Sequence, residues 1–364
     1  MRSGRERKIN LGIKCLKMSE ATKTKERDVA LDYIRVLAML MIAFCHFFQI
    51  INSLELAFWL NVGVQIFLVL SARLLCEKDF RTGKEVLRFY GTRLVRIMLP
   101  VWIYLTAICG VLYIIKQPPS LISVVVYALG GAAFIKSGVL GLGHFWYLSI
   151  ILIAYLITPL LAYFSQTIKK VKNWVVVLFF TITLLLLTAL FFLLGNPSYG
   201  IHLSLFIIAY YVFQRQKEDT KWAEKGIKYV CIPMLLFVAA RIVCSIVSIE
   251  NWEHYVLYDA TFVPTCKAVL GYWLFCVAYW LFSKERFQIG KKAIAVLSAV
   301  SFEIYITHQF IELAVYEYVP YCNSGTLFGG LLMFIVSAVL IAINTLVLHY
   351  CVILLKKGFV KLKK

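Results

Sequence analysis

The stretch LDYIRVLAMLMIAFCHFFQII at residues 31–51 is apolar enough to cross a bilayer, yet it carries an acid, a cation and an imidazole. Asp32, Arg35 and His46 are costly in lipid, and such residues mark functional sites by default. At about 100° per residue, the eleven steps from Arg35 to His46 bring the two side chains back to within about 20°, roughly 16 Å apart along the axis. Asp32 lies one turn before Arg35 on the same face. One helix face therefore presents an acid, a cation and a titratable imidazole.

The composition is that of a polytopic membrane protein. Hydrophobic residues make up 61% of the 364 positions and charged residues only 16%, and the mean hydropathy is +0.81. The net charge of +19 would suggest nucleic-acid binding in a soluble protein. Here Lys and Arg cluster in short loops between apolar runs, which indicates membrane orientation and no nucleic-acid partner.

The ten cysteines are scattered through apolar runs with no C-x-x-C pair, so we expect buried apolar side chains and no metal site. Cys45, beside His46, stays open as a nucleophile. The sequence predicts an all-α fold of about ten transmembrane helices and one short re-entrant or interfacial segment at 121–135. The ten runs are 31–51, 56–76, 94–116, 144–165, 174–194, 200–213, 228–248, 262–283, 294–316 and 327–355.

Loop charges predict that both termini are cytoplasmic, because the alternate loops on that side are rich in Lys and Arg. A full crossing by 121–135 would move Lys169, Lys170 and Lys172 to the outside, which the positive-inside rule rejects. Arg35 then lies near the cytoplasmic surface and His46 in the outer half. We expect a basic cytoplasmic segment at 1–28, a membrane domain at 29–356 and a basic tail at 357–364. The first run reads as an uncleaved span, and translation starts at Met1 or Met18.

Two arginines mark the predicted cytoplasmic surface. Arg93 and Arg96 are three residues apart and share a helix face just before an apolar run. Such a pair can clamp phosphates with fork-shaped donors, or can be a plain positive-inside anchor. The second run ends at the same surface with Ser71 and Arg73.

Aromatic residues open the fourth span at the outer surface. His144, Trp146 and Tyr147 stand there either as an interfacial belt or as a platform for a sugar ring. The ninth span carries Glu303 and His308, each of which needs a partner or a water-filled cavity inside an apolar run.

Five blocks, in order, resemble the acyltransferase-3 superfamily of membrane acyltransferases, and the resemblance covers nearly the whole chain from residue 27. They are Leu31-Asp32 with Arg35 and His46; Gly63-Val64, Phe67 and Leu70-Ser71; Arg93, Arg96 and Pro100; Phe145-Trp146-Tyr147, Tyr155 and Pro159; and Ser301, Tyr305 and His308. Ala72 stands where the family usually has glycine, and Arg73 where it usually has an apolar residue.

The resemblance implies transfer of an acyl group, usually acetyl, from a cytoplasmic acyl-CoA donor to a hydroxyl of an envelope glycan or lipid-linked sugar. It places Arg93 and Arg96 on the phosphates of the donor, and we add Ser71 and Arg73 at that surface. It places Arg35 and His46 in the reaction chamber.

The chemistry needs a base for the hydroxyl proton and a donor for the oxyanion. We assign His46 as the base, although an acyl-histidine intermediate also satisfies the pattern. Arg35 would orient the thioester arm or pair with Asp32, with His308 and Glu303 as further catalytic candidates. The predicted acceptor-binding residues are His144, Trp146, Tyr147 and Tyr305.

A transporter or flippase is the main alternative, since it too would place polar residues in spans. Transporters are often built from inverted repeats, and we find none here. A purely structural subunit would not explain the paired arginines together with the Arg35–His46 face. We expect a multi-pass protein of the bacterial cytoplasmic membrane that contacts lipid and a saccharide acceptor. The acceptor, the acyl group and the oligomeric state are not readable from the sequence.

Overall fold

The computed structural model describes residues 28–135, 138–217, 219–247 and 258–362, and every regular element in these ranges is a helix. Nine helical segments among them are long and apolar enough to cross a membrane. They are α2 (Val29–Ile50), the pair α3 (Leu54–Leu60) and α4 (Gly63–Leu75), α5 (Gly83–Ile114), α7 (Trp146–Lys170), α8 (Asn173–Leu193), α10 (Trp222–Ile246), α11 (Val263–Phe282), α12 (Lys291–Tyr318) and α13 (Leu327–Leu362). The chain is thus a multi-pass membrane protein, as its composition indicates.

The remaining predicted span, the sixth at 200–213, corresponds to α9 (Ser198–Arg215), which has the length of a span but a less apolar composition. Nearly all of its side chains are buried, because α4, α7, α8 and α11 pack around it. A helix enclosed by protein can carry polar groups such as His202 and Gln214 without exposing them to lipid. The expected total of ten crossings and the cytoplasmic location of both termini therefore stay predictions.

The segment predicted to be re-entrant or interfacial is short in the structure. It consists of α6 (Leu121–Ala128) and the 3-10 turn η1 (Ala132–Phe134). Eight helical residues rise only about 12 Å, well short of a hydrocarbon core of about 30 Å. This segment does not cross as a helix; its depth in the membrane stays a prediction.

The second span is two helices that make one crossing. The chain tightens at Asn61 and Val62, where the amides of Val62 and Val64 bond to carbonyls three residues earlier. Gly63 opens α4 in close contact with α2, and a Cβ built on it would lie 2.6 Å from the Ala38 carbonyl oxygen. The break turns Asn61 toward the interior of the bundle, where the functional residues lie.

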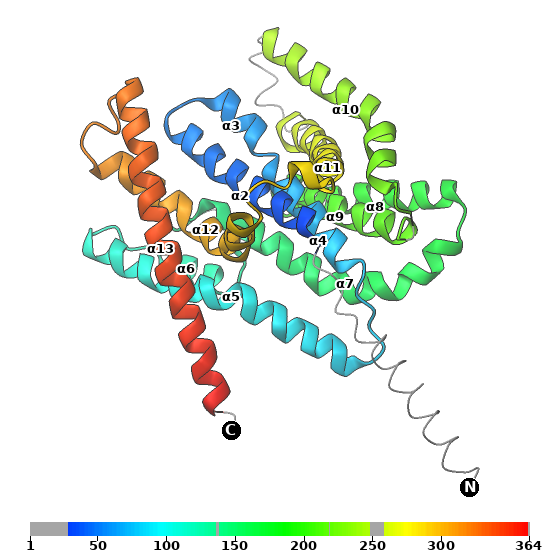
Figure 1. Cartoon of the computed structure of the whole chain (residues 1–364), viewed down its shortest axis with the longest axis horizontal. Coiled ribbons are helices and arrows are strands. Elements are labelled where there is room, and N and C mark those ends of the chain that lie inside the picture. Colours follow the sequence, from blue (N-terminus) through cyan, green and yellow to red (C-terminus); the bar gives the residue numbers. More distant parts are fainter. Residues whose placement is uncertain (1–27, 136–137, 218, 248–257, 363–364) are drawn as a thin grey trace.

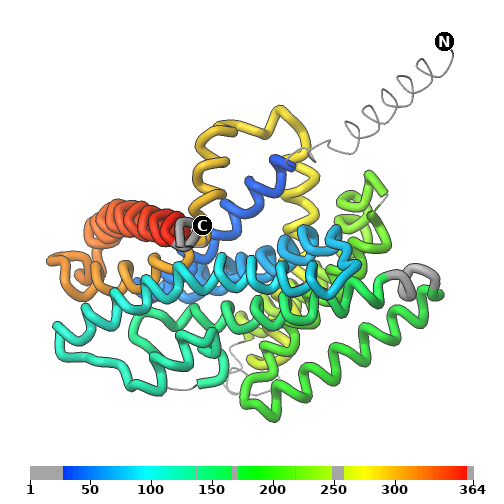
Figure 2. The backbone as a smooth tube through the Cα atoms, turned by 90° about the horizontal axis from the view of Figure 1, so that it is seen from below, coloured from blue at the N-terminus to red at the C-terminus, as the bar shows by residue number. Residues whose placement is uncertain are grey.

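The helix that carries Arg35 and His46 lies at the centre of the fold (Figure 1). It packs most extensively against α12 and also contacts α3, α4 and α11. By contrast, α8, α10 and α13 lie at the edges and expose many apolar side chains, as helices that face lipid do. Helices α5 and α7 run beside each other and are in contact (Figure 2).

The two ends of the bundle differ in chemistry. We name the end where α4 finishes and α5 starts the basic end, and the end that holds His46 the histidine end. Asp28 caps α2 at the basic end by accepting from the Ala30 amide at 3.1 Å. Apart from Asp28, the predicted segment 1–28 lies outside the described residues. Helix α13 continues through residue 362 into the predicted tail.

Candidate active site

A cavity of about 820 Å³ opens at the basic end between α4, α5, α7, α12 and α13. We call it the basic cavity because six cationic side chains line it: Arg35, Lys78, Arg93, Arg96, Lys217 and Lys356. They come from five separate parts of the chain and converge only in the fold. A cavity of this size with so many cations fits a large ligand that carries several negative charges.

Arg93 and Arg96 both face the basic cavity, as their spacing on one helix requires. The Arg93 guanidinium lies over the ring of Tyr155 at 5.2 Å and over Phe89 at 5.6 Å. These cation–π contacts hold its planar fork in place while leaving its donors toward the cavity. Arg96 is more exposed and lies at the mouth.

Arg35 reaches the inner part of the same cavity in a fixed orientation. Its Nη1 donates to Asp32 Oδ1 at 3.2 Å and to Ser298 Oγ at 2.8 Å. The Ser298 hydroxyl in turn donates to Asp32 Oδ1 at 2.7 Å. The pairing of Arg35 with Asp32 that the sequence left open is present, and Ser298 of α12 completes it.

Glu303 and Ser71 also line the basic cavity, away from His46. Glu303 Oε1 lies 3.1 Å from His349 Nδ1 of α13, so this carboxylate has a partner within the cavity wall. Arg73 does not line the cavity. It pairs at 2.6 Å with Glu77, which itself lines the cavity, and its guanidinium lies 5.9 Å from the centre of the Phe213 ring.

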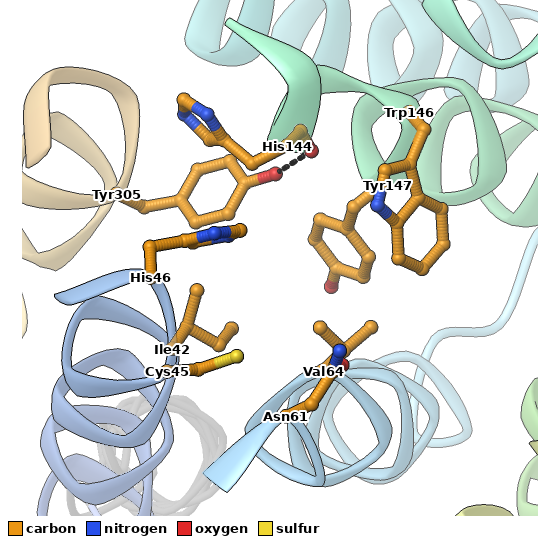
Figure 3. Close-up of a pocket in the computed structure, with 9 residues that line it drawn as sticks. All are labelled: Ile42, Cys45, His46, Asn61, Val64, His144, Trp146, Tyr147 and Tyr305. Atoms are coloured by element: carbon orange, nitrogen blue, oxygen red, sulfur yellow. Dashed lines mark hydrogen bonds between the residues drawn. The ribbon is translucent and has the colours of Figure 1, made fainter. Parts of the chain in front are cut away.

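A second, much smaller cavity (Figure 3) shares Tyr147 and Tyr305 with the first. Its volume is about 30 Å³, and we call it the histidine pocket. His46 projects into it from α2, while Asn61 and Val64 close it from the broken second span. The other residues that line it are Ile42, Cys45, His144, Trp146, Tyr147 and Tyr305.

Three histidines from three elements gather at this pocket. The ring of His46 lies 5.9 Å from that of His144 and 5.2 Å from that of His308, centroid to centroid. His308 is fully buried behind the other two, and its Nδ1 lies 2.8 Å from the Tyr305 carbonyl oxygen. Among the described residues, no group of His, Cys, Asp and Glu side chains is arranged to hold a metal ion.

Gln309 links two of these histidines. Its Oε1 accepts from the His144 amide at 3.0 Å and lies 2.6 Å from His144 Nδ1, while its Nε2 lies 3.2 Å from His46 Nδ1. His46 Nδ1 is closer, at 2.8 Å, to Gln49 Oε1. The shorter contact with an acceptor favours the tautomer protonated at Nδ1, which leaves Nε2 able to take a proton.

The aromatic residues at the start of α7 turn into the protein. Trp146 lines the pocket, and its indole stacks on Tyr199 at 5.3 Å and on His202 at 5.2 Å. Tyr147 is 7% exposed, and its hydroxyl lies beside Ser71. Of the two interpretations of these aromatics, the platform facing a cavity agrees better with this arrangement than an interfacial belt.

The structure brings in several residues that sequence reasoning did not single out: Asn61, His202, Ser298, Gln309 and His349. Gln309 and His349 are polar residues inside apolar runs. A polar side chain in a membrane span costs free energy, and this was the signal by which they could have been found. Ser298 gave no signal, because only the packing of α2 on α12 places its hydroxyl beside Asp32.

A protein-family model described as an acyltransferase domain matches residues 28–347. No curated protein and no solved structure matches the chain.

Proposed function

The chain belongs to the acyltransferase-3 family and is a membrane acyltransferase, and we propose that it transfers an acetyl group from acetyl-CoA to a hydroxyl of an envelope glycan or lipid-linked sugar. One observation carries this proposal: a large basic cavity meets the His46 pocket at a shared wall inside the bundle. Family membership favours acyl transfer over transport.

The basic cavity suits the donor because coenzyme A carries three phosphate groups. Arg93 and Arg96 would hold them through fork-shaped donors, and Lys78, Lys217 and Lys356 would add to the positive field. The excess of cations at this end favours its location in the cytoplasm, where acyl-CoA is available. The histidine end would then face the acceptor side of a bacterial cytoplasmic membrane.

His46 would act as the general base. In this step His46 Nε2 takes the proton of the acceptor hydroxyl as the hydroxyl oxygen attacks the thioester carbonyl. The new C–O bond forms, the C–S bond breaks, and the proton passes from His46 to the leaving thiolate. The products are the O-acyl ester and free coenzyme A, so atoms and charge balance without another reactant.

Arg35 would position the pantetheine arm near the inner end of the cavity. Its guanidinium stays protonated and cannot serve as a base. Asp32 and Ser298 fix the direction of the guanidinium. A side chain held in this way is suited to orienting the polar pantetheine arm. Trp146 would contact the acceptor beside the hydroxyl that enters, because a pocket of about 30 Å³ has no room for a whole sugar ring.

The test is transfer of radiolabelled acetyl from acetyl-CoA by the purified protein in nanodiscs to envelope glycan extracted from the producing cells. Wild type should label the glycan, and His46→Ala at equal abundance should lose at least about 100-fold of the rate, since general bases contribute roughly 10²–10⁴-fold. His349→Ala removes an imidazole from the wall of the basic cavity instead, so it should change KM for acetyl-CoA more than the rate at saturating donor. Full transfer by His46→Ala would remove the base assignment, and glycan left unlabelled by wild type would overturn the acceptor proposal.

A further inference from the structure

Tyr147 and Tyr305 line both the basic cavity and the histidine pocket. Their ring centroids are 5.7 Å apart, and the ring planes meet at 70°. In Figure 3 the two rings stand between His144 above and the α2 and α4 residues below. An acyl group that enters from the basic cavity must therefore pass this pair of rings to reach His46.

The two rings are held in place by their surroundings. The Tyr305 hydroxyl donates to the His144 carbonyl oxygen at 2.5 Å, and its ring is stacked on Phe302 with centroids 6.2 Å apart. Tyr305 is 4% exposed and Tyr147 is 7% exposed. Packed interiors resist the insertion of additional methylene groups, because neighbouring side chains must leave their preferred rotamers.

The space beyond the rings is small. The histidine pocket of about 30 Å³ offers room for on the order of one or two water-sized groups. The methyl group of an acetyl thioester is of that size, whereas a propionyl or butyryl chain is longer by one or two methylene groups. The wide cavity on the other side of the rings gives no such limit.

We propose that Tyr147 and Tyr305 form an acyl-length filter that admits acetyl and rejects longer straight-chain acyl groups. This inference rests on the proposed function, and it assigns selectivity to the wall between the two cavities rather than to the coenzyme A site. The filter acts by steric exclusion: a longer chain cannot place its carbonyl carbon beside His46 unless a ring moves. One methylene group typically changes kcat/KM by roughly 10–200-fold in such a pocket.

The experiment measures kcat/KM for acetyl-, propionyl- and butyryl-CoA with the same extracted glycan. Wild type should prefer acetyl over butyryl by at least about 100-fold. Tyr147→Ala should reduce that ratio at least about 10-fold, because it removes one ring from the passage. Val64→Ala enlarges the histidine pocket from α4 and leaves both tyrosines in place, so it should move the preference toward propionyl. This variant provides the test if Tyr147→Ala does not fold.

Tyr155→Ala is the matched control. Tyr155 lies two turns along α7 on the same face as Tyr147 and lines only the basic cavity. Loss of its contact with Arg93 should raise KM for all three donors by the same factor and leave the ratio unchanged.

The outcomes separate the two proposals. Equal use of acetyl and butyryl by wild type, or an unchanged ratio in both enlarged variants, would overturn the filter while leaving acyl transfer intact. Glycan left unlabelled from all three donors would overturn the proposed function and the filter with it.

Discussion

The Arg35 guanidinium and the Asp32 carboxylate form an ion pair of 3.2 Å one turn apart on α2, and Ser298 of α12 bonds to both. Charged side chains inside a membrane helix bundle are costly, and they are usually paired with each other or with hydrogen-bonding groups. Here the arrangement points a permanently charged group into the basic cavity along a fixed direction. Under the proposed function, the pair would position the donor.

Asp32→Asn should leave Arg35 charged but poorly oriented. Loss of a charge-assisted hydrogen bond costs about 1.5–3 kcal/mol, so we expect kcat/KM for acetyl-CoA to fall by roughly 10–100-fold. Ser298→Ala removes a single hydroxyl from the same network and should cost about 5-fold. Steady-state transfer assays at equal protein abundance measure both changes.

Asp28→Asn is the control for this prediction. Asp28 is a second carboxylate on the same turn of chain, where it caps α2 and accepts from the Tyr279 hydroxyl at 2.9 Å. Asparagine can still accept from the Ala30 amide but not also from the Tyr279 hydroxyl, so the melting temperature should fall slightly and the rate per folded molecule should stay near wild type. An equal loss of rate in Asp28→Asn and Asp32→Asn would mean that Asp32 acts through the stability of α2 alone.

Arg93→Gln and Arg96→Gln should each raise KM for acetyl-CoA by about 5–30-fold with little change in kcat, because each removes contacts made equally before and during the reaction. Raising the ionic strength should raise the wild-type KM as well, since exposed charges are screened. Arg88→Gln is the matched control, because Arg88 lies on the same helix but does not line the basic cavity. An unchanged KM in both variants would return the pair to the role of topology anchors.

The order and extent of the helices were largely predictable, because long apolar runs can cross a bilayer only as helices. Each predicted span coincides with a helix to within a few residues at its histidine end. At the basic end the agreement is poorer, and α5 begins at Gly83 rather than near 94. Helices continue beyond the apolar zone wherever capping and packing allow, and Thr82 caps α5 by accepting from the Glu85 amide.

The relative positions of site residues could be predicted where the residues lie on one helix. They could not be predicted where the residues come from several helices. Periodicity alone put Arg35 near Asp32 and on the same face as His46. It could not show that Tyr147 lines both cavities, or that Arg73 lies beside Phe213 and is not among the residues that line the basic cavity. Those facts depend on how α4, α7 and α9 pack against one another, which a residue pattern along one helix does not encode.

Gln309→Leu tests the link between His46 and His144. The substitution removes, at similar volume, the amide that holds His144 and packs against His46, so the arrangement of the two imidazoles should be lost. We expect kcat to fall roughly 10–100-fold, while KM for acetyl-CoA stays within about 2-fold, because Gln309 lies outside the basic cavity. Gln288→Leu, which removes a glutamine bonded to the Phe282 carbonyl at the basic end, should change neither constant. A parallel rise in KM would argue for general disorder of α12 instead.

His46 should not retain an acetyl group. If the base assignment holds, incubation with radiolabelled acetyl-CoA without acceptor leaves the protein unlabelled, and transfer kinetics require both substrates to be bound together. Mass spectrometry of intact protein after rapid quenching measures the adduct directly. A mass increase of one acetyl group that disappears in His46→Ala would establish the acyl-histidine route and replace direct transfer.

Gly63→Ala should destabilise the fold through a single backbone contact. A Cβ at this position would lie 2.6 Å from the Ala38 carbonyl oxygen, which is backbone of α2 and cannot swing away. Forced overlap of this kind typically costs about 1–3 kcal/mol, so the yield of monodisperse protein and its melting temperature should fall. Gly110→Ala on α5 is the matched control, because no atom lies within 4 Å of its added Cβ; there the helix should become slightly more stable, as alanine favours helix over glycine. Equal melting temperatures for the two variants would mean that α2 and α4 can move apart at the break, and the histidine pocket between them would then not be rigid enough to select an acyl length.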